Sequence, residues 1–561
     1  MSERSGGGEQ PRAQHGIGRA VAPGGMKGMP DLLADGRGMS LARITFSVLI
    51  QAAAAGLAAL ATRSLFVALA EDAPSADPFW LAILVLSGAT LALFRIDARV
   101  QGERMGQSYA HAVRRALYRH ASRMPQNAVD ERRAGYMSLR FVGDLAALKS
   151  WGALGLPRLI GGAVVLPATA LVLYLIEPLF ALVAAPLMAL GVAFMLGLGH
   201  RLYDRHRALR SRRARIAADL TERMPLAPRL DMLGRTRQEL ALIDKRTAEM
   251  IPAAIARVRG AELVKAIPDA LAGMIAATVL ATGFWNGNST ADLAGALAAL
   301  GLSLQPIRDL ALVQNQRAAW RAAQEKCAAV FERPVRRRGK PKRPAPAGPL
   351  GIRISDLTLG PLSNLTLSAE AGEHVALLGP NGSGKSTLLA ALAGLVEPEG
   401  GRIRVGGTAP VAAQGQTRVT LLTREAPVLR GSLRKALTLG LRKRPTDNVL
   451  HARIAEVGLD PLLHRLGGLD GSVGEGARDL SDGERAKIAL VRTILGRSSL
   501  LLIDRVEPLL DPPGQRALQT LIEETNATVV RVIAGRSEQR ENETLWDLKS
   551  ETGVGRTARS T

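Results

Sequence analysis

Long apolar stretches fill roughly the first 320 of the 561 residues and are absent from the rest of the chain. A helix needs about 20 mostly apolar residues to cross the hydrocarbon core of a bilayer, and about six stretches are long enough. Segment 179–196 is apolar on all sides, whereas a surface helix of a soluble domain keeps a polar face. Buried helices of a soluble protein are the alternative, which the missing polar face disfavours. The predicted spans are Ile44–Ala70, Pro78–Phe94, Leu156–Ile176, Leu179–Gly199, Val264–Trp285 and Leu293–Leu312.

The connections between these spans differ in charge. Residues 71–77, 177–178 and 286–292 contain no Lys or Arg, whereas 95–155 and 200–262 are rich in Arg. Because cytoplasmic loops carry the excess of basic residues, we expect the two long connections and both termini in the cytoplasm. We expect a multi-pass chain in a bacterial-type inner (plasma) membrane.

The long connections show apolar periodicity mixed with charge at 109–124 and 208–224, which predicts helices that extend the spans into the cytoplasm. Reversals are expected near 130–135 and 225–234. Such reversals would contact the domain that follows the spans in the chain, and ordinary solvated turns are the alternative.

Ionisable residues also fall in or near the spans. Charges at membrane depth are costly and usually face a cavity or a partner, so each of these residues is a candidate substrate contact. A charge that reaches the membrane surface is an equally good interpretation. The residues are Arg63, Arg158, Asp269, Arg308 and Asp309.

The net charge of +23 raises the possibility of nucleic-acid binding. However, basic residues cluster between the apolar spans, as in 201–207 and 210–213, and aromatic residues that would stack on bases make up only 3% of the chain. We therefore expect a lipid bilayer, and no nucleic acid, as partner. Cys327 is the single cysteine, which excludes an internal disulfide.

The composition divides the chain into five regions. We expect a disordered cytoplasmic tail over 1–40, a membrane domain over 41–333, a basic Pro-rich linker over 334–350, a second domain over 351–545, which the motif described below makes a nucleotide-binding domain, and a second disordered tail over 546–561. The predicted fold class is an all-α polytopic membrane domain followed by an α/β domain, which the loop motif described next identifies as a P-loop NTPase domain.

A glycine-rich loop in the second domain matches the pattern G-x-x-x-x-G-K-[ST]. An apolar run over 374–378 predicts the strand before it, and 386–394 predicts the helix after it, with Gly394 as the stop. The glycines allow consecutive backbone N–H groups to point at a phosphate, and the Lys adds a positive charge toward the β- and γ-phosphates. We expect ATP and Mg²⁺ as cofactors, bound by Gly379, Pro380, Asn381, Gly382, Ser383, Gly384, Lys385, Ser386 and Thr387.

Two further segments complete this pattern. The strand-like run 500–504 ends in Asp504, which together with the Ser386 hydroxyl is a candidate Mg²⁺ ligand. Before it, a Gly-rich approach leads into a segment that turns helical after Ser481, with the residues Leu480, Ser481, Asp482, Gly483 and Glu484. Ser481 and Glu484 have the spacing of a capping box.

Here the chain resembles the ATP-binding cassette (ABC) transporter family, specifically a half-transporter of the exporter type with its membrane domain first. The resemblance covers about residues 41–545. Residues 480–484 resemble the signature motif LSGGQ, which in this family caps the ATP held by the opposite subunit, and they depart from it at Asp482 and Glu484. Asp482 would place a negative charge near that γ-phosphate.

Further departures affect hydrolysis. The catalytic glutamate of the family follows the Asp of the acidic strand, where this chain has Arg505. Gly535 stands at the position of the switch histidine, and Arg424 near that of the Q-loop glutamine. No Phe, Tyr or Trp occurs between Gly351 and Leu378, where the family has its adenine-stacking aromatic residue.

A positioned general base contributes about 10²–10⁴ in rate, and Arg505 removes it. The resemblance therefore implies a site that binds ATP and hydrolyses it slowly or not at all. Glu507 offers one rescue, because a local bulge could bring it toward the γ-phosphate as an out-of-register base.

The leading hypothesis is the ATP-binding and permease subunit of an exporter for an unknown substrate. The degenerate positions indicate a dimer of half-transporters, in particular a heterodimer with a catalytically competent partner. The alternative is a catalytically silent, ATP-sensing membrane assembly or regulatory protein.

Overall fold

The computed structural model describes residues 28–71, 77–130, 143–336, 348–410, 419–441, 443–548 and 557–558. The chain divides into two compact units. The first, here the helical unit, contains Met1–Ser122 and Arg132–Arg333, and the second, the cassette unit, contains Arg123–Glu131 and Pro334–Thr561.

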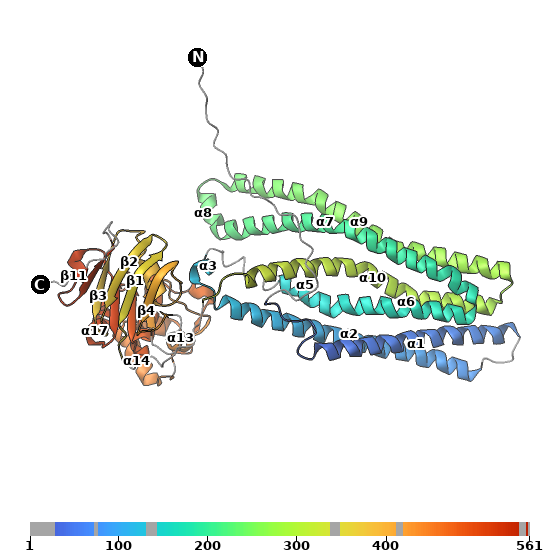
Figure 1. Ribbon diagram of the computed structural model, residues 1–561, viewed down its shortest axis with the longest axis horizontal. Coiled ribbons are helices and arrows are strands. Elements are labelled where there is room, and N and C mark those ends of the chain that lie inside the picture. Colours follow the sequence, from blue (N-terminus) through green and yellow to red (C-terminus); the bar gives the residue numbers. More distant parts are fainter. Residues whose placement is uncertain are drawn as a thin grey trace, which may run out of the picture. The chain divides into compact units, whose positions relative to one another are not determined.

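Long antiparallel helices build the helical unit (Figure 1). Within the described residues, six helices are long and apolar enough to cross a membrane, in agreement with the predicted fold class. The helices are α1 (Arg37–Ala70), α2 (Pro78–Ala121), α5 (Leu145–Ser150) with the π-helical turn η2 (Trp151–Gly155) and α6 (Leu156–Ile176), α7 (Pro178–Arg223), α8 (Ala227–Met232), α9 (Thr236–Asn286) and α10 (Thr290–Phe331).

The helices extend well beyond the predicted spans at one end of this unit. The predicted helical extensions of the spans are confirmed, because α2 continues to Ala121 and α7 to Arg223. The reversal expected near 225–234 is also confirmed, since a 3-10 turn over Met224–Leu226 and α8 connect α7 to α9. The other expected reversal lies almost wholly outside the described residues, which end there at Asp130.

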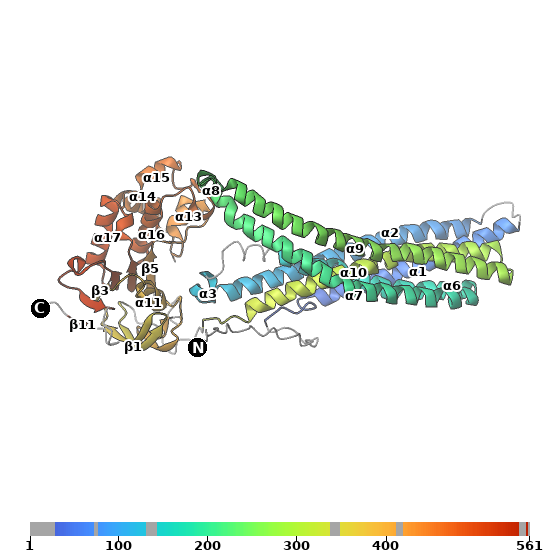
Figure 2. The ribbon, with the colours of Figure 1, turned by 90° about the horizontal axis from the view of Figure 1, so that it is seen from above.

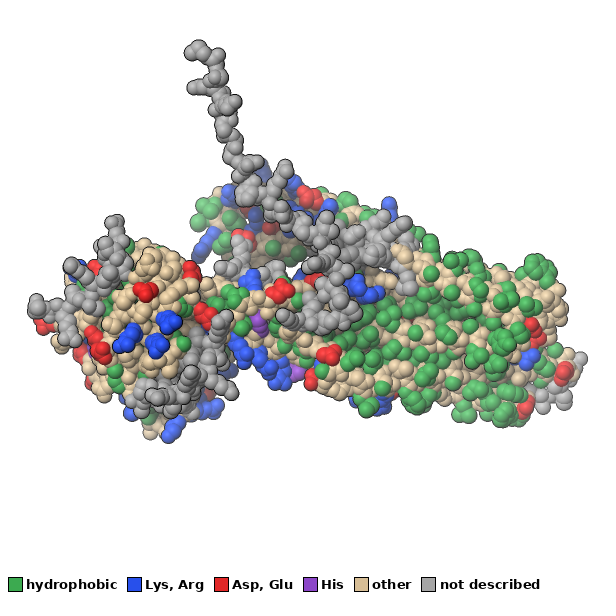
Figure 3. All heavy atoms as spheres, in the orientation of Figure 1, with side chains coloured by type: hydrophobic (Ala, Val, Ile, Leu, Met, Phe, Trp, Pro, Cys, Tyr) green, Lys and Arg blue, Asp and Glu red, His purple; other side chains and the backbone are tan. Residues whose placement is uncertain are grey.

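Side chains cap the helices at the short connections. Asp77 accepts a hydrogen bond from the Phe79 N–H at the start of α2, and Ser289 forms a capping box with Asp292 at the start of α10. These caps satisfy N–H groups that a helix start leaves without an intrahelical partner. In the space-filling view, hydrophobic side chains cover much of the visible surface of the membrane helices (Figure 3).

All five ionisable residues singled out in the spans make ion pairs. Arg63 contacts Asp292 at 2.6 Å, and Arg158 contacts Asp309 at 3.2 Å. Arg308 donates from Nε and Nη2 to Oδ1 of Asp269, at 2.9 and 2.7 Å. These pairs join α1 to α10, α6 to α10 and α9 to α10 across the helical unit.

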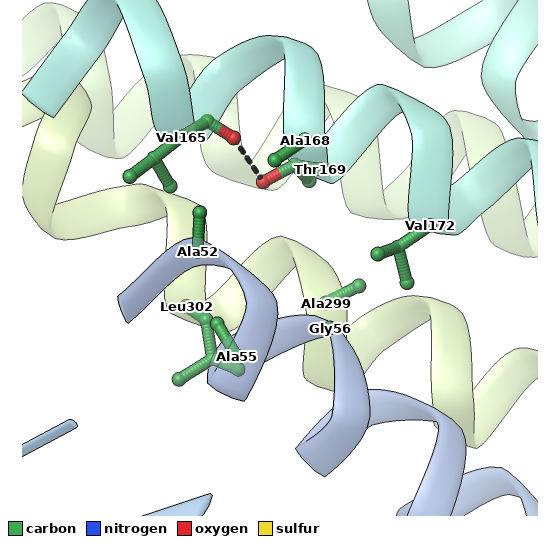
Figure 4. A pocket seen from close by; sticks show the side chains of 9 residues that line it. All are labelled: Ala52, Ala55, Gly56, Val165, Ala168, Thr169, Val172, Ala299 and Leu302. Carbon is green, nitrogen blue, oxygen red and sulfur yellow. Dashed lines mark hydrogen bonds between the residues drawn. The ribbon is translucent and has the colours of Figure 1, made fainter. Parts of the chain in front are cut away.

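Small residues set the close approaches between helices. A Cβ added at Gly106 of α2 would lie 2.5 Å from the Lys149 carbonyl oxygen, and one at Gly152 would lie 3.2 Å from the Gly106 Cα. Elsewhere α1, α6 and α10 enclose a recess lined by small and apolar side chains (Figure 4). Thr169 in this recess donates its hydroxyl to the Val165 carbonyl, so its polar group is satisfied within α6.

The cassette unit contains a central six-stranded sheet in the order β11-β10-β3-β9-β8-β5, parallel except for β11. A separate antiparallel sheet has the order β2-β1-β4. The central strands are β3 (His374–Leu378), β5 (Val419–Thr423), β8 (Leu500–Asp504), β9 (Thr528–Val532), β10 (Thr544–Asp547) and β11 (Thr557–Ala558). The other strands are β1 (Ile352–Leu359), β2 (Leu362–Ala369), β4 (Gly400–Val405), β6 (Gly431–Ser432) and β7 (Ser472–Val473).

Helices complete the cassette unit, which confirms the α/β class. Figures 1 and 2 show the β1 sheet at one end of this unit and α13–α15 at the other. The helices are α11 (Lys385–Leu392), α13 (Leu433–Thr438), α14 (Asp447–Glu456), α15 (Asp460–Arg465), α16 (Asp482–Gly496) and α17 (Pro512–Glu524).

One segment from the first third of the sequence also belongs to the cassette unit. It includes α3 (Gln126–Asp130), whose Gln126 N–H donates to the Leu395 carbonyl at 3.0 Å. Arg336 donates its backbone N–H to the Arg123 carbonyl and its Nη1 to the Gly394 carbonyl. The chain between the two long helices α2 and α6 therefore contributes directly to the packing of the cassette.

The element bounds differ from the expected regions at both tails, and strand β11, which pairs with β10, also lies within the expected C-terminal tail. Helix α1 begins at Arg37, within the expected N-terminal tail, and β10 runs to Asp547, within the expected C-terminal tail. Trp546 is fully buried in β10, because that strand pairs with β3 in the centre of the sheet. Residues 1–27, 549–556 and 559–561 of the two expected tails, and 337–347 of the expected linker, lie outside the described residues.

Candidate nucleotide-binding site

The phosphate-loop residues connect β3 to α11, as their pattern predicts. Gly382 and Gly384 have φ values of 82° and 91°, a left-handed conformation that suits residues without a side chain. A Cβ at Gly384 would also lie 2.9 Å from Cγ of Leu362. The sequence therefore needs glycine at Gly384 for its conformation and for the close packing of the loop on β2.

Lys385 lies at the first position of α11 and is 5% exposed. Its Nζ donates to the carbonyl oxygens of Gly379 and Pro380 at 2.6 and 2.7 Å. Burial lowers the pKa of the Lys385 ammonium, the positive charge of Arg505 lowers it further, and Asp504 opposes both. The ammonium is thus held inside the loop by neutral carbonyl oxygens, which an anionic phosphate could replace.

Ser383 provides a second sign of an anion site. Its Oγ is buried and has no hydrogen-bond partner among the described residues. A buried hydroxyl without a partner is costly, and a phosphate oxygen would satisfy it. Together with the Lys385 ammonium, this unsatisfied hydroxyl shows that the loop fits a nucleotide phosphate. Ser386 and Thr387 continue the first turn of α11.

Asp504 ends β8, and Arg505 follows it in a left-handed conformation with φ of 49°. The Nη2 of Arg505 donates to Oδ1 of Asn381 at 2.9 Å. Strand order explains the contact, because only β9 separates β8 from β3, which leads into the loop. A cation therefore lies at the rim of the phosphate loop, where the family pattern has a carboxylate.

Glu507 begins the short 3-10 helix Glu507–Leu509 and is partly buried. Burial raises the pKa of its carboxyl, and the negative charge of Glu538 adds to this, whereas Arg531 lowers it. Arg531 itself makes a two-point ion pair with Glu543, at 2.6 and 2.7 Å. The charges of Arg531 on β9 and of Glu538 after this strand therefore act on the Glu507 carboxyl.

Gly535 follows β9 in an extended conformation and offers no side chain. Its neighbours are held by Glu538, whose carboxylate accepts from the Ala534 N–H at 2.9 Å and whose own N–H donates to the Gly535 carbonyl. The position at which the family has its switch histidine therefore offers only backbone groups to a nucleotide.

The signature-like segment starts helix α16. Ser481 accepts from the Glu484 N–H at 3.1 Å, and Glu484 accepts from the Ser481 N–H at 2.8 Å, which confirms the capping box. Leu480 is buried beside it, and a Cβ at Gly483 would lie 2.9 Å from the Leu509 carbonyl oxygen.

Arginines surround both acids of this segment. Asp482 pairs with Arg485 and with Arg424, the latter at 2.9 Å, and these hydrogen bonds lower the pKa of its carboxyl. Arg465 pairs with Glu484 at 3.0 Å. The negative charge that the sequence places at the start of α16 is therefore balanced by nearby guanidinium groups.

Sequence reasoning identified Arg424, Arg505, Asn381 and Asp482 singly and missed their pairing. Asn381 and Arg505 are 124 residues apart, and Arg424 and Asp482 are 58 apart. One signal was available, since Arg424 and Asp482 are departures of opposite charge from the same family pattern.

Comparison with known proteins gives two family matches. A model described as "ABC transporter transmembrane region" matches residues 41–293, and one described as "ABC transporter" matches residues 362–509.

Similar curated proteins include the ABC transporter ATP-binding protein RamB of Streptomyces coelicolor, 38% identical over 179 residues, which are 31% of this chain and 29% of that protein. Antigen peptide transporter 1 of Rattus norvegicus is 32% identical over 176 residues, 31% of this chain and 24% of that protein. The Beta-(1-->2)glucan export ATP-binding/permease protein NdvA of Rhizobium meliloti is 31% identical over 163 residues, 28% of each chain. The matched stretch thus spans less than a third of the length of each of these relatives.

Proposed function

This chain belongs to the ABC transporter family, with a membrane region and an ATP-binding region in one polypeptide, and from this premise we propose that it is one half of an exporter dimer whose own site binds Mg-ATP but hydrolyses it slowly or not at all. The observation that carries the proposal is the contact between Arg505 and Asn381. A guanidinium at this rim favours an anionic phosphate, yet it cannot accept the proton of an attacking water.

The loop residues support ATP binding. The N–H groups of Asn381, Gly382 and Gly384 and the start of α11 would face the phosphates, with Lys385 and Ser383 as side-chain donors. Ser386 and Asp504 would hold Mg²⁺, whose charge offsets that of the phosphates. Arg505 would contribute a further cation toward the γ-phosphate.

The signature segment supports a second contribution, to a site on a partner subunit. In this proposal Ser481 and Gly483 cap the ATP bound by the partner, and the arginines around Asp482 reduce the repulsion that its carboxylate would cause. A heterodimer follows, in which the partner supplies an intact catalytic glutamate and most of the hydrolysis.

The charge distribution supports a plasma-membrane location with the cassette in the cytoplasm. The connection before α2 and those before α7 and α10 are short and lack Lys and Arg, while the helices extend at the opposite, Arg-rich end. This orientation gives the phosphate loop access to cellular ATP.

The test uses the full chain purified in lipid nanodiscs. We expect it to bind radiolabelled ATP with Mg²⁺ and to show little ATPase activity, whereas Lys385→Ala loses the binding. Arg505→Glu, which restores a carboxylate after Asp504, is expected to raise turnover, since a positioned base is worth about 10²–10⁴ in rate. Robust turnover of the unmodified chain that Glu507→Gln abolishes would contradict the proposal and assign the base to Glu507.

The heterodimer is tested by co-purification with a second membrane-plus-cassette protein that carries an intact Asp-Glu pair. ATP-dependent substrate movement in vesicles that contain both chains is expected. ATP binding by both chains without any such movement would favour a silent assembly or regulatory protein.

A further inference from the structure

Three arginines lie on the solvent side of the small antiparallel sheet in the cassette unit. Buried and exposed residues alternate along β1 and β4, as expected for strands that cover a core with one face. Arg353 of β1 and Arg402 and Arg404 of β4 are exposed, whereas Ile354 and Ile403 are buried. Since β2, β1 and β4 lie side by side (Figure 1), the three guanidinium groups share one open face, here called the arginine face.

The strand register places two of these charges directly opposite each other. Arg353 pairs with Arg404 in the antiparallel ladder, and Ser355 pairs with Arg402. Side chains opposite each other on one face have Cβ atoms about 5 Å apart, and like charges there destabilise a sheet. Charged side chains on an edge strand prevent pairing with other chains, which would account for the arginines of β4. It does not account for Arg353, because β1 is the middle strand of this sheet.

Acidic side chains do not neutralise the arginine face. In the described parts of the chain, none of its three arginines makes an ion pair. The acids that flank these strands in the sequence are Asp356, Glu370 and Glu399. Asp356 accepts from the Thr366 hydroxyl at 3.5 Å, and Glu399 accepts from the Gly360 N–H at 3.4 Å. The face therefore presents positive charge that an external anion could pair with.

The spacing of the charges matches an extended acidic peptide. Arg402 and Arg404 are two residues apart on one strand, which separates them by about 6.6 Å. An extended peptide repeats the side chains of one face at the same interval. A segment with Asp or Glu at alternate positions, lying along β4, would therefore bring a carboxylate to each arginine. The planar guanidinium group is suited to this, because it binds a carboxylate in a two-point contact.

Other anionic partners match the arginine face less well. Single-stranded nucleic acid is held largely by stacking of its bases on aromatic rings, and the only Phe, Tyr or Trp after residue 331 is Trp546, which is fully buried. Duplex DNA is bound through about six to ten phosphate contacts, more than three arginines provide. A second copy of this chain has the same net charge of +23 and offers no acidic counterpart.

We propose that the arginine face of β1 and β4 is a docking surface for an extended, acidic segment of another cytoplasmic protein. Carboxylates of that segment pair with Arg402 and Arg404 along β4 and with Arg353 beside them, which removes the repulsion across the ladder. This goes beyond the proposed function, because it assigns a second binding surface to the cassette. Its test measures no nucleotide, so its failure is distinguishable from a failure of the nucleotide-site proposal.

Peptide binding to the full chain in phosphatidylcholine nanodiscs tests the docking surface. The probe is fluorescein-labelled Thr-Glu-Thr-Glu-Thr-Glu-Thr, and the same peptide with Gln in place of Glu should not bind. Arg353→Gln with Arg404→Gln should weaken binding about tenfold, because each exposed ion pair contributes up to about fivefold. Arg444→Gln with Arg516→Gln removes the same charge from exposed sites elsewhere on the cassette and should change binding less than about twofold. Equal weakening by both double variants would overturn the proposal.

Thermal stability distinguishes a docking surface from a structural role of the arginines. Arg404→Glu places opposite charges across the ladder, so it should raise the Tm while it weakens peptide binding more than about tenfold. Stability and binding then change in opposite directions, and misfolding does not explain the lost binding. A lower Tm for Arg404→Glu would show that the arginines stabilise the fold and would overturn the proposal.

Competition experiments identify the class of anion. The unlabelled peptide should displace the probe at least about tenfold better than inorganic phosphate, phosphatidylglycerol vesicles or an oligothymidylate, each at equal negative charge. Equal or better displacement by any of these three would contradict an acidic protein segment and assign the arginine face to a phosphate, a lipid surface or a nucleic acid.

Discussion

Arg424 and Asp482 lie 58 residues apart in the sequence, and Nη2 of Arg424 donates to Oδ2 of Asp482 at 2.9 Å. Each residue departs from the pattern of the ABC family, Arg424 after β5 and Asp482 at the start of α16. Their pairing means that one departure compensates the charge of the other. It also connects the end of a central strand to the helix that begins with the signature segment.

This pairing predicts coupled effects of substitution. Asp482→Asn should lower the Tm of the cassette in the native background and change it less when Arg424→Gln is also present, because the pair is then already broken. The side chains are 69% and 39% exposed, so solvent screens the interaction and the effect should be small. Thermal unfolding of the native chain, the two single variants and the double variant should show the coupling at low ionic strength. The coupling should be lost in about 1 M salt. Additive Tm shifts at low salt would contradict the pairing.

Arg505 should discriminate between ATP and ADP. If its guanidinium contacts the γ-phosphate, Arg505→Gln loses a hydrogen bond to a charged group, worth about 1.5–3 kcal/mol. ATP affinity should then fall by about tenfold to a hundredfold, while ADP affinity changes little. Equilibrium binding to the chain in nanodiscs measures both, with Arg516→Gln on α17 as a matched surface control. An equal loss for both nucleotides would contradict the γ-phosphate contact.

Glu507 should destabilise the fold at neutral pH. Burial raises the pKa of its carboxyl above the usual value, so the native state is penalised once the unfolded carboxyl ionises. Below a pH of about 4.3 the Glu507 carboxyl is protonated in both the folded and the unfolded state, so the fold has its full stability. As the pH rises through the raised pKa, this stability is lost, because the unfolded carboxyl ionises more readily than the folded one. Glu507→Gln should therefore raise the Tm at about pH 8 and have almost no effect at about pH 4. The same gain at both pH values would refute this account.

Glycine at the crossing of α2 and η2 should be required for packing. Gly106→Ala places a Cβ 2.5 Å from the Lys149 carbonyl oxygen, which is backbone and cannot easily move. It should lower the Tm in nanodiscs. Gly88→Ala on the same helix is the control, because its Cβ meets no atom within 4 Å and alanine favours a helix over glycine by about 1 kcal/mol. A Tm gain for both variants would show that the crossing has room for a side chain.

Features that depend on neighbouring residues were predictable from the sequence. Apolar length predicted the membrane helices, and the capping box of Ser481 with Glu484 followed from a spacing of three residues. The loop between β3 and α11 was predictable for the same reason, since its glycines and Lys385 lie within one short segment. Boundaries were less predictable, because pairing of β10 with β3 carries the fold past the last expected residue of the domain.

The sequence by itself determined the two kinds of domain, the phosphate loop and the absence of a carboxylate directly after Asp504, because each depends on composition or local spacing. Only the tertiary structure decided which charges meet. The order of β3, β9 and β8 in the sheet brings Arg505 to Asn381, and the packing of α9 on α10 brings Asp269 to Arg308. Ion pairs act over a few ångströms, and the distance between residues far apart in sequence is fixed only when strands and helices pack.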